Sequence, residues 1–407
     1  MTPSHSLPPC RHAATPAATP FVHARRAPSR VVSVLTTALV ALVCAVPMTA
    51  PRAQGQPQSE SQPQPQPQAQ AVQPSALYAA GLRVAALPYR GQSMPVAVTY
   101  PTRAPEAVTD LGPYRLTVAK GAPPAPQSSP ATGWPVVFVS HGTGGSLFGH
   151  ADLVAGLARA GHVVVSLEHP GDNYRDRSLV GDPRYFTERP AQLLAVMRAV
   201  LDVDGDAGAA MRALIGDVPV DARRVAVIGH SAGGYTAAAV AGARGSAGRV
   251  TAHCAAHAQD DPMCALRDPR AHVAPGFSGP RFALPPDAPM PVSLHEPRVR
   301  AAVLMAPLTV PLEPESLAAV PARLLVMGAR SDAVLPARFH FEPWARWAPA
   351  AQRVEDTQAG HYGYMTSVPP ERRAMLGPAG QDPDGFDRAA FQRALVQQIA
   401  AFLDGTR

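Results

Sequence analysis

Apolar and polar residues along the chain follow a pattern that predicts alternating strands and helices. Five continuous apolar runs are typical of strands that are buried on both faces. These runs lie at residues 135–142, 162–171, 223–229, 300–307 and 322–330. Helical periodicity is found at residues 150–161, 189–202 and 386–404. The alternation predicts a mostly parallel central sheet with helices on both faces, which binds ligands at the carboxyl ends of its strands.

Three further segments refine this picture. Residues 82–89 and 95–101 alternate between apolar and polar side chains, which predicts a hairpin at the edge of the sheet. The helix at 189–202 is expected to be amphipathic, with Pro190 near its start. Residues 243 to about 297 are rich in proline, arginine, histidine and aspartate and break the alternation. We expect them to form a lid-like insertion over the carboxyl edge of the sheet.

Residues 1–53 have the features of an export signal. A cluster of arginines precedes an uncharged apolar stretch at residues 31–50, as in the n-region and h-region of a signal peptide. The alternative is a membrane anchor formed by residues 31–50, but this stretch is barely long enough and Pro47 interrupts its end. The sequence therefore predicts export to the periplasm or the medium, with membrane contact only through this segment if it is not cleaved.

Residues 54–74 are rich in glutamine and proline and contain almost no apolar side chains, which predicts a disordered linker. The folded domain is then expected at residues 75–407, a length that can bury a large core. The formal net charge of +6 does not indicate a nucleic-acid partner. Residues 1–53 hold five arginines and no acidic residue, while the rest of the chain holds 31 basic and 30 acidic residues.

The segment GHSAG at residues 229–233 has the spacing of a strained turn that exposes a serine between a strand and a helix. Gly229 and Gly233 allow the strand and the helix to approach closely, and His230 and Ser231 lie between them. A serine that only caps the helix would explain Ser231 but neither glycine. We therefore predict that Ser231 is a nucleophile.

A serine hydroxyl attacks efficiently only when a base removes its proton and an acid orients that base. Asp332 follows the last apolar run, and His361 lies between small residues before the final helix. Both follow Ser231 in the order Ser, Asp, His, which predicts Asp332 as the acid and His361 as the base. Asp332 could instead cap a following helix, and Glu313 is the alternative acid.

The glycine-rich segment SHGTGG at residues 140–145 follows a buried strand. Such a loop places backbone N–H groups against the oxyanion of a tetrahedral intermediate, and we expect the donors to be Thr143 and Ala232. A phosphate site is the alternative use of a glycine-rich loop. The segment lacks the G-x-G-x-x-G spacing and the lysine of a P-loop, so no phosphate and no cofactor is expected.

Two of the four cysteines, Cys254 and Cys264, lie in the expected insertion. In an exported protein they are expected to form a disulfide that closes a short loop. Together with His253 and His257 they also have a spacing that could hold a metal ion. We expect no metal, and a metal-dependent hydrolase is kept as an alternative.

Seven segments within residues 82–403 resemble the α/β-hydrolases, and more narrowly the dienelactone-hydrolase-like and platelet-activating-factor-acetylhydrolase-like esterases. These segments are PVAVTYP, SHGTGG, EHPGDN, ERPAQLLAVMRAVLD, GHSAGG, GARSDAVLP and AGHYGY. The resemblance implies an α/β-hydrolase fold and a serine esterase. Dienelactone hydrolases proper use a cysteine where this chain has Ser231, and the platelet-activating-factor enzymes carry their acid after an earlier strand than Asp332.

The sequence therefore favours an exported serine esterase that forms an acyl-enzyme from a small-molecule or lipid-like ester. Lactones, phospholipid acyl groups, polyesters and amides are the alternative substrates, because the same residues could cleave them. A different hypothesis is a non-catalytic binding protein with the same fold, tethered by residues 54–74. The complete set of predicted nucleophile, acid, base and oxyanion donors argues against that hypothesis.

Overall fold

The structure is a computed structural model of the chain, and it describes residues 77–127, 133–202, 205–267, 293–356 and 358–405. The predicted export signal and linker lie outside the described residues, as do residues 268–292 of the expected insertion. Within the described ranges, every helix is too short or too polar to cross a membrane.

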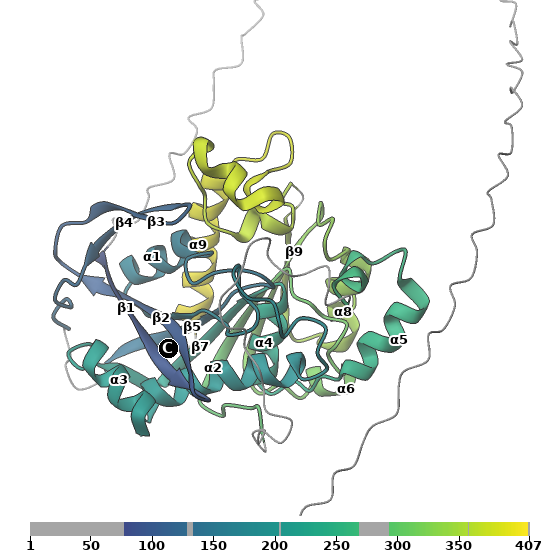
Figure 1. Cartoon of the computed structure of the whole chain (residues 1–407), viewed down its shortest axis with the longest axis horizontal. Helices are drawn as coiled ribbons and strands as arrows, with labels where there is room; N and C mark the ends of the chain where they lie inside the picture. The colour runs from purple at the N-terminus through teal and green to yellow at the C-terminus, as the bar shows by residue number, and fades with distance from the viewer. Residues whose placement is uncertain (1–76, 128–132, 203–204, 268–292, 357, 406–407) are drawn as a thin grey trace, which may run out of the picture. The chain divides into compact units, whose positions relative to one another are not determined.

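The described residues form a sheet whose strands run in the order β10-β9-β8-β7-β5-β6-β2-β1-β4-β3 (Figure 1). The strands are β1 (Ala79–Tyr89), β2 (Gln92–Thr102), β3 (Ala107–Leu111), β4 (Tyr114–Lys120), β5 (Trp134–Ser140), β6 (Val163–Leu167), β7 (Val220–His230), β8 (Val299–Met305), β9 (Arg323–Ala329) and β10 (Gln352–Asp356). From β10 to β6 all neighbours are parallel, whereas β2 is antiparallel to both β6 and β1. The predicted mostly parallel sheet is confirmed, and its five predicted buried strands are β5 to β9.

The hairpin prediction is confirmed for the pairing but is wrong for the position. β1 and β2 pair antiparallel along their whole length, from Ala79 opposite Thr102 to Tyr89 opposite Gln92. They do not form the edge of the sheet, because β4 pairs with β1 and β3 then pairs with β4. The strands β3, β4 and β10 were not predicted, since they are short and many of their side chains are exposed.

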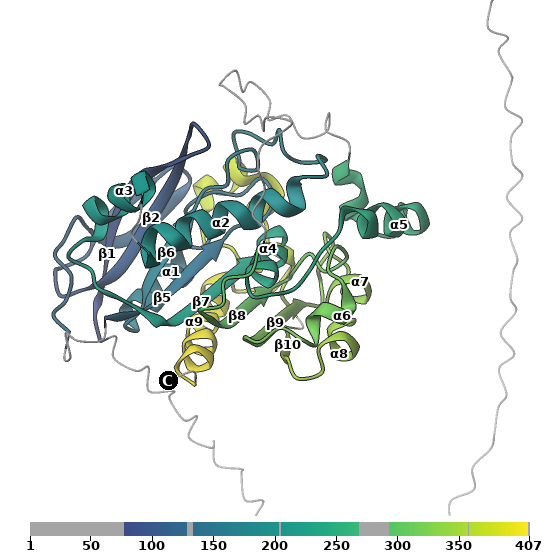
Figure 2. The same cartoon turned by 90° about the horizontal axis from the view of Figure 1, so that it is seen from below.

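Helices cover both faces of the sheet, as Figure 2 shows. Side chains of α2, α3 and α4 pack into the apolar core on one face, and those of α1 and α9 into the core on the other. The helices are α1 (Ala151–Arg159), α2 (Tyr185–Leu201), α3 (Gly205–Ile215), α4 (Ala232–Val240), α5 (Ala247–His257), α6 (Pro314–Leu317), α7 (Ala337–His340), α8 (Trp344–Trp347) and α9 (Arg388–Asp404), with the 3₁₀ turns η1 (Pro262–Arg267), η3 (His361–Tyr364) and η4 (Pro370–Gly380).

The helix α2 differs from its prediction in two ways. It begins at Tyr185, one turn early, so Pro190 lies inside it rather than near its start. Proline has no N–H to offer the carbonyl oxygen of Phe186, and the hydroxyl of Tyr235 donates to that oxygen instead, at 2.8 Å. The helix is not amphipathic, because it packs between α3 and α4 and is buried along most of its length. Its buried polar residues are Glu188, Arg189 and Gln192.

The parallel strands bring the predicted site residues to one edge of the sheet. Because neighbouring parallel strands point the same way, the segments that follow β5, β7 and β9 meet at their common carboxyl edge. These segments carry Thr143, Ser231 and Asp332. The helices of the insertion that the structure describes, α5 and η1, come after α4 in the chain.

Candidate active site

Ser231 stands on the sharp turn between β7 and α4. Its backbone angles, φ 58° and ψ −121°, lie in a region that residues with a side chain rarely adopt. Hydrogen bonds hold the backbone of this turn through both the N–H and the carbonyl group of Ser231. The Ser231 N–H donates to the carbonyl oxygen of Met305 at 3.0 Å, and the Ser231 carbonyl oxygen accepts from Gly234 and Leu308 at 2.9 Å each.

The two glycines of the turn are required by close backbone contacts. A Cβ atom at Gly229 would lie 1.9 Å from the carbonyl oxygen of Gly233, and one at Gly233 would lie 2.0 Å from the carbonyl oxygen of Ser140. Both contacts are with backbone, which cannot rotate away as a side chain can. The spacing of GHSAG therefore reflects the packing of α4 against the ends of β7 and β5.

The predicted acid and base lie in contact. His361 Nδ1 donates to Asp332 Oδ2 at 2.7 Å, and the two side chains are 4% and 3% exposed. The other carboxylate oxygen accepts from the backbone N–H groups of Val334 and Leu335 at 2.9 and 2.7 Å. Asp332 thus caps its own loop and also binds His361. With the proton on Nδ1, the Nε2 atom of the neutral ring carries the lone pair that can accept a proton.

The alternative acid, Glu313, is engaged elsewhere. Its Oε2 atom accepts from Arg244 Nε at 2.8 Å, and its backbone N–H donates to the Arg244 carbonyl oxygen at 2.9 Å. Glu313 therefore ties the start of α6 to the segment after α4. Among the described residues, Glu313 makes no hydrogen bond to His361 like the one that Asp332 makes.

His230, between Gly229 and Ser231, supports the backbone of the predicted base. Its Nε2 atom donates to the carbonyl oxygen of His361 at 2.9 Å, and the centroids of the two rings are 4.8 Å apart. On its other side, His230 packs edge-on against buried His150. Burial lowers the pKa of His230 well below its ordinary value, and the neighbouring histidines lower it further. The ring is therefore neutral and acts as a hydrogen-bond donor.

The glycine-rich loop at residues 140–145 lies against the predicted nucleophile. A Cβ atom on Gly142 would be 3.0 Å from the Cβ atom of Ser231. The side chain of Thr143 is fixed by Tyr185, whose hydroxyl lies 2.7 Å from Thr143 Oγ1. Ala232, the other predicted donor, is buried at the start of α4. The structure therefore brings the loop of Thr143 and the first residue of α4 together at Ser231.

A buried ion pair, Arg189 with Asp172, lies beneath this loop, and both side chains are 0% exposed. Asp172 Oδ1 accepts from the backbone N–H of Gly144 at 2.8 Å. Asp172 Oδ2 accepts from Arg189 and from the Tyr185 hydroxyl, the latter at 2.8 Å. One carboxylate thus holds the backbone of the glycine-rich loop and orients the tyrosine that fixes Thr143.

Arg189 connects the same loop to the helix that follows Ser231. Its guanidinium donates to the carbonyl oxygen of His141 and to Ser140 Oγ, the second at 3.3 Å. Its Nε atom donates to Thr236 Oγ1 on α4 at 3.2 Å. Because the donors of a guanidinium have a fixed planar arrangement, these contacts hold the loop and the helix in one register.

Two buried histidines complete the network. Ser140 Oγ donates to His169 Nε2 at 2.8 Å, and His169 Nδ1 donates to Gln192 Oε1 at 2.7 Å. The backbone N–H of His169 donates to His141 Nε2 at 3.1 Å. Burial and the Arg189 charge lower the pKa of His141 to about 3 and that of His169 well below its ordinary value. Both rings are therefore neutral connectors.

The sequence alone did not reveal the roles of Asp172, Arg189, Tyr185 and His169. The segments EHPGDN and ERPAQLLAVMRAVLD, which contain most of these residues, support the family resemblance. The sequence of these segments alone does not show that a charged residue in a loop and one in a helix are buried and paired. The available signal was the spacing of charged residues within segments that also carry apolar periodicity.

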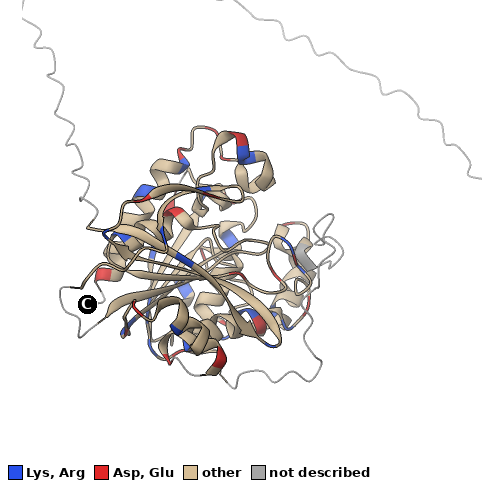
Figure 3. Cartoon of the chain, turned by 60° about the vertical axis from the view of Figure 1, so that its left-hand side comes forward, with Lys and Arg blue, Asp and Glu red and all other residues tan. Residues whose placement is uncertain are grey.

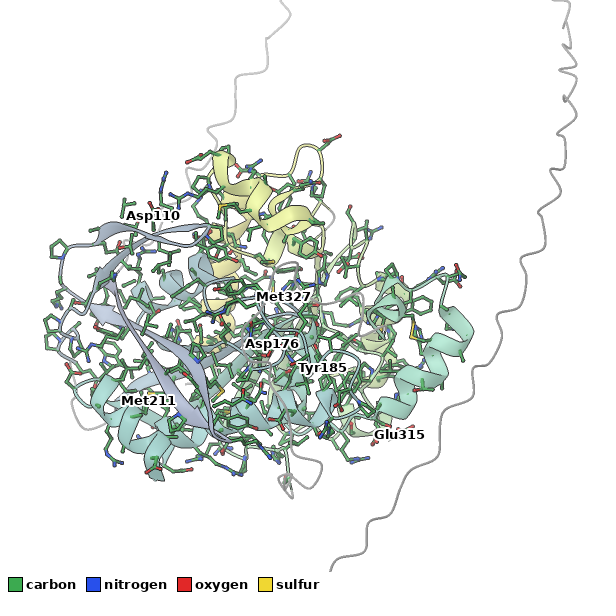
Figure 4. All side chains as sticks on the ribbon, in the orientation of Figure 1. Asp110, Asp176, Tyr185, Met211, Glu315 and Met327 are labelled. Atoms are coloured by element: carbon green, nitrogen blue, oxygen red, sulfur yellow. A yellow bond between two sulfur atoms is a disulfide. The ribbon has the colours of Figure 1, made fainter. Side chains whose placement is uncertain are left out.

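A cavity of about 130 Å³ opens beside Thr143 and Leu308. Its walls come from the segment at residues 180–186 and from α5 and η1. The lining residues are Thr143, Val180, Gly181, Asp182, Pro183, Tyr185, Phe186, Ala247, Val250, Thr251, Met263 and Leu308. Most of these side chains are apolar, and Figure 4 labels Tyr185 among them.

Cys254 of α5 and Cys264 of η1 form a disulfide, so their sulfur atoms are bonded to each other rather than available to a metal. His253 and His340 both donate to Asp261 Oδ2, at 2.8 and 3.0 Å. In the described part of the chain, no group of three or more His, Cys, Asp or Glu side chains is arranged to hold a metal ion. The disulfide and Asp261 instead tie the insertion together and to α7.

A comparison with protein-family models agrees with this fold. Residues 136–376 match the model of the alpha/beta hydrolase family. A solved structure of a ferulic acid esterase from Streptomyces cinnamoneus is similar, with 18% identity, coverage of 81% of this chain and 90% of that chain, and a TM-score of 0.48. A protein assigned as a dienelactone hydrolase from Klebsiella pneumoniae subsp. pneumoniae is also similar, with 17% identity, coverage of 74% and 99%, and a TM-score of 0.34. No curated protein sequence matches the chain significantly.

Replacing Gly233 with alanine is expected to destabilise the domain by roughly 1–3 kcal/mol or more, because the new Cβ atom would overlap the Ser140 carbonyl oxygen. Gly248→Ala is the control, since this helical glycine has no backbone atom of another element near its Cβ position. Thermal unfolding followed by circular dichroism measures both. Equal unfolding temperatures for the two variants would contradict the argument.

Replacing Arg189 with methionine leaves the buried Asp172 carboxylate without its cation, and we expect a loss of about 3–5 kcal/mol in the free energy of unfolding. Arg198→Met removes a similar side chain from the exposed face of α2 and is expected to have little effect. Urea denaturation compares the two. Adding Asp172→Asn to the Arg189 variant should recover part of the loss, and full additivity of the two losses would argue against a pair.

Proposed function

The chain belongs to the alpha/beta hydrolase family, and we propose that it is a serine hydrolase that cleaves carboxylic esters. The observation that carries this proposal is the hydrogen bond from His361 Nδ1 to Asp332 Oδ2, at the same sheet edge as the strained turn of Ser231. The glycine-rich loop at residues 140–145, packed against Ser231, supports it further.

In the proposed reaction, His361 Nε2 takes the proton of the Ser231 hydroxyl while Oγ forms a bond to the ester carbonyl carbon. Asp332 fixes the ring in the required tautomer and stabilises the imidazolium that forms. The backbone N–H groups of Thr143 and Ala232 donate to the developing oxyanion. When the intermediate collapses, the imidazolium gives its proton to the leaving alkoxide, which departs as an alcohol.

The acyl-enzyme is then hydrolysed by the same groups. His361 Nε2 removes a proton from a water molecule, whose oxygen attacks the acyl carbon, and Ser231 Oγ leaves with the proton returned by the imidazolium. The carboxylic acid is released and the serine is regenerated. The sequence of steps needs no cofactor.

The apolar cavity supports a substrate with at least one compact apolar group. Its volume of about 130 Å³ is similar to that of cavities that hold a single benzene-sized group. An ester, a lactone or an amide would present the same carbonyl carbon to Ser231. The cavity therefore selects the group next to that carbon and does not decide which type of bond is cleaved. We propose an ester, because an alkoxide leaves more easily than an amide nitrogen.

We also propose that the protein is exported. The arginine cluster and the apolar stretch at residues 31–50 support export, and the disulfide between Cys254 and Cys264 is compatible with an oxidising compartment. In such a compartment the disulfide would persist, because no reducing system is present to break it.

Ser231→Ala is expected to lower kcat for a p-nitrophenyl ester of a short acid by about 10⁴-fold or more, because the nucleophile is removed. Ser331→Ala, a serine beside Asp332 whose exposed side chain has no part in the proposed reaction, is the matched control. Release of p-nitrophenolate measures both, and labelling by a fluorophosphonate probe should be lost only in the Ser231 variant. Wild-type labelling of that variant would exclude Ser231 as the nucleophile.

Asp332→Asn is expected to lower kcat by about 10³–10⁴-fold, because the amide no longer holds His361 in the correct tautomer. Glu313→Gln tests the alternative acid and should retain nearly all activity, since Glu313 binds Arg244 instead. The same p-nitrophenyl ester serves as substrate, and circular dichroism verifies that both variants are folded. A large loss in the Glu313 variant alone would reverse the assignment.

A further inference from the structure

Asp261 is a buried acid whose partners differ from those of most acidic residues in the domain. Figure 3 shows basic and acidic positions interspersed over the domain, and many of them form ion pairs with each other. The Asp261 side chain is 0% exposed, and its Oδ2 atom accepts from His253 Nε2 at 2.8 Å and from His340 Nε2 at 3.0 Å. Its Oδ1 atom accepts from the backbone N–H of Met263 at 3.2 Å. Burial raises the pKa of Asp261, but these hydrogen bonds lower it more, so the group is a carboxylate with both oxygens engaged.

The hydrogen bonds of His340 determine which of its ring nitrogens carries the proton. The backbone N–H of Thr309 donates to His340 Nδ1 at 3.1 Å. A backbone N–H can only donate, so Nδ1 carries no proton and the Nε2–H group faces Asp261. Burial lowers the pKa of His340 more than the charge of Asp261 raises it, which keeps the ring in this neutral form. The Thr309 hydroxyl also donates to the His340 carbonyl oxygen at 2.6 Å, so two hydrogen bonds join these residues.

Both ends of this chain of hydrogen bonds reach the cavity beside Ser231. Met263, held by Asp261 at one end, and Leu308, next to the threonine at the other end, both line that cavity. The backbone N–H of Leu308 also donates to the carbonyl oxygen of Ser231 at 2.9 Å. Asp261 and His340 therefore link the cavity wall that belongs to the insertion with the wall that binds the turn of the proposed nucleophile.

The insertion side of the cavity is a cross-linked unit. The disulfide between Cys254 and Cys264 joins α5 to η1. His253 of α5 lies one turn after Val250, which lines the cavity, and it donates to Asp261, which immediately precedes η1. Because α5 and η1 are joined to each other in these two ways, the hydrogen bond from His340 to Asp261 positions both of them relative to α7.

We propose that Asp261, acting through His340, is a positioning residue that sets the width of the cavity and so limits the size of the substrate group beside Ser231. With a side chain that is 0% exposed, Asp261 acts only through the residues that it holds. Its hydrogen bonds are directional, whereas the apolar packing of the cavity walls is not. This inference rests on the proposed esterase function, and it gives that reaction a structural basis for a size limit.

Two variants break this link at different points. In Asp261→Asn the amide has one acceptor oxygen where the carboxylate has two, so either Met263 or the histidines lose their acceptor. In His340→Asn the shorter side chain is able to accept from Thr309 but no longer reaches Asp261. Asp260→Asn is the matched control, because this neighbouring acid has a side chain that is 57% exposed and forms surface ion pairs at 3.7 and 3.8 Å.

The test measures size selectivity on both sides of the ester bond. One pair of substrates is p-nitrophenyl benzoate and p-nitrophenyl 2-naphthoate, which differ in the acyl group, and the other is phenyl acetate and 2-naphthyl acetate, which differ in the alcohol. A naphthyl group exceeds the benzene-sized space of about 130 Å³, so wild-type protein is expected to prefer the smaller ester of at least one pair. In both variants the naphthyl-to-phenyl ratio of kcat/KM for that pair should rise about tenfold. In the double variant it should rise no further, because both changes break the same link.

Each ratio compares two esters on one preparation, so it does not depend on the fraction of protein that is folded. Asp260→Asn should keep the wild-type ratio. Ratios that stay unchanged in both pairs, whether or not activity falls, would overturn the inference by showing that Asp261 only supports the fold. A wild-type protein with no preference in either pair would overturn it too, and multiplied effects in the double variant would contradict the route through His340. Failure of wild-type protein to cleave any of the four esters would instead count against the esterase function itself.

Discussion

The close approach of the turn at Ser231 to the end of β5 determines the geometry of the site. With the Cβ position of Gly233 only 2.0 Å from the Ser140 carbonyl oxygen, α4 starts directly against the strand that leads into the glycine-rich loop. The same contact puts the Ser231 side chain beside Gly142. The proposed nucleophile and oxyanion loop need to be adjacent, and backbone packing places Ser231 and Gly142 side by side before any other side chain contributes.

Backbone packing alone would not hold a glycine-rich loop in one conformation, because glycine loses more conformational entropy on ordering than other residues. The buried pair of Arg189 and Asp172 opposes this tendency by binding backbone atoms of His141 and Gly144. The pair costs desolvation free energy and contributes little net stability relative to apolar packing. Its effect is on the shape of the loop, which explains why two charges are retained in the core beneath it.

The buried strands and the positions of the segments at their ends could be predicted from sequence because both signals are local. An apolar run of strand length, followed at once by SHGTGG, GHSAG or the Asp332 segment, is enough to place each at the carboxyl edge. The strands β3 and β10 could not be found this way, since exposed short strands have no clear apolar period. The pairing of Asp172 with Arg189 also escaped prediction, because it depends on the packing of α2 into the core and not on neighbouring letters.

The charges around the site divide into those that cancel and one that does not. Asp172 is paired with Arg189, and burial keeps the rings of His141, His169 and His230 neutral, so these groups beneath the glycine-rich loop add no unpaired charge. Asp332 is the exception, because its Oδ2 atom faces His361 Nδ1 at 2.7 Å and in the proposed reaction its charge would stabilise the imidazolium.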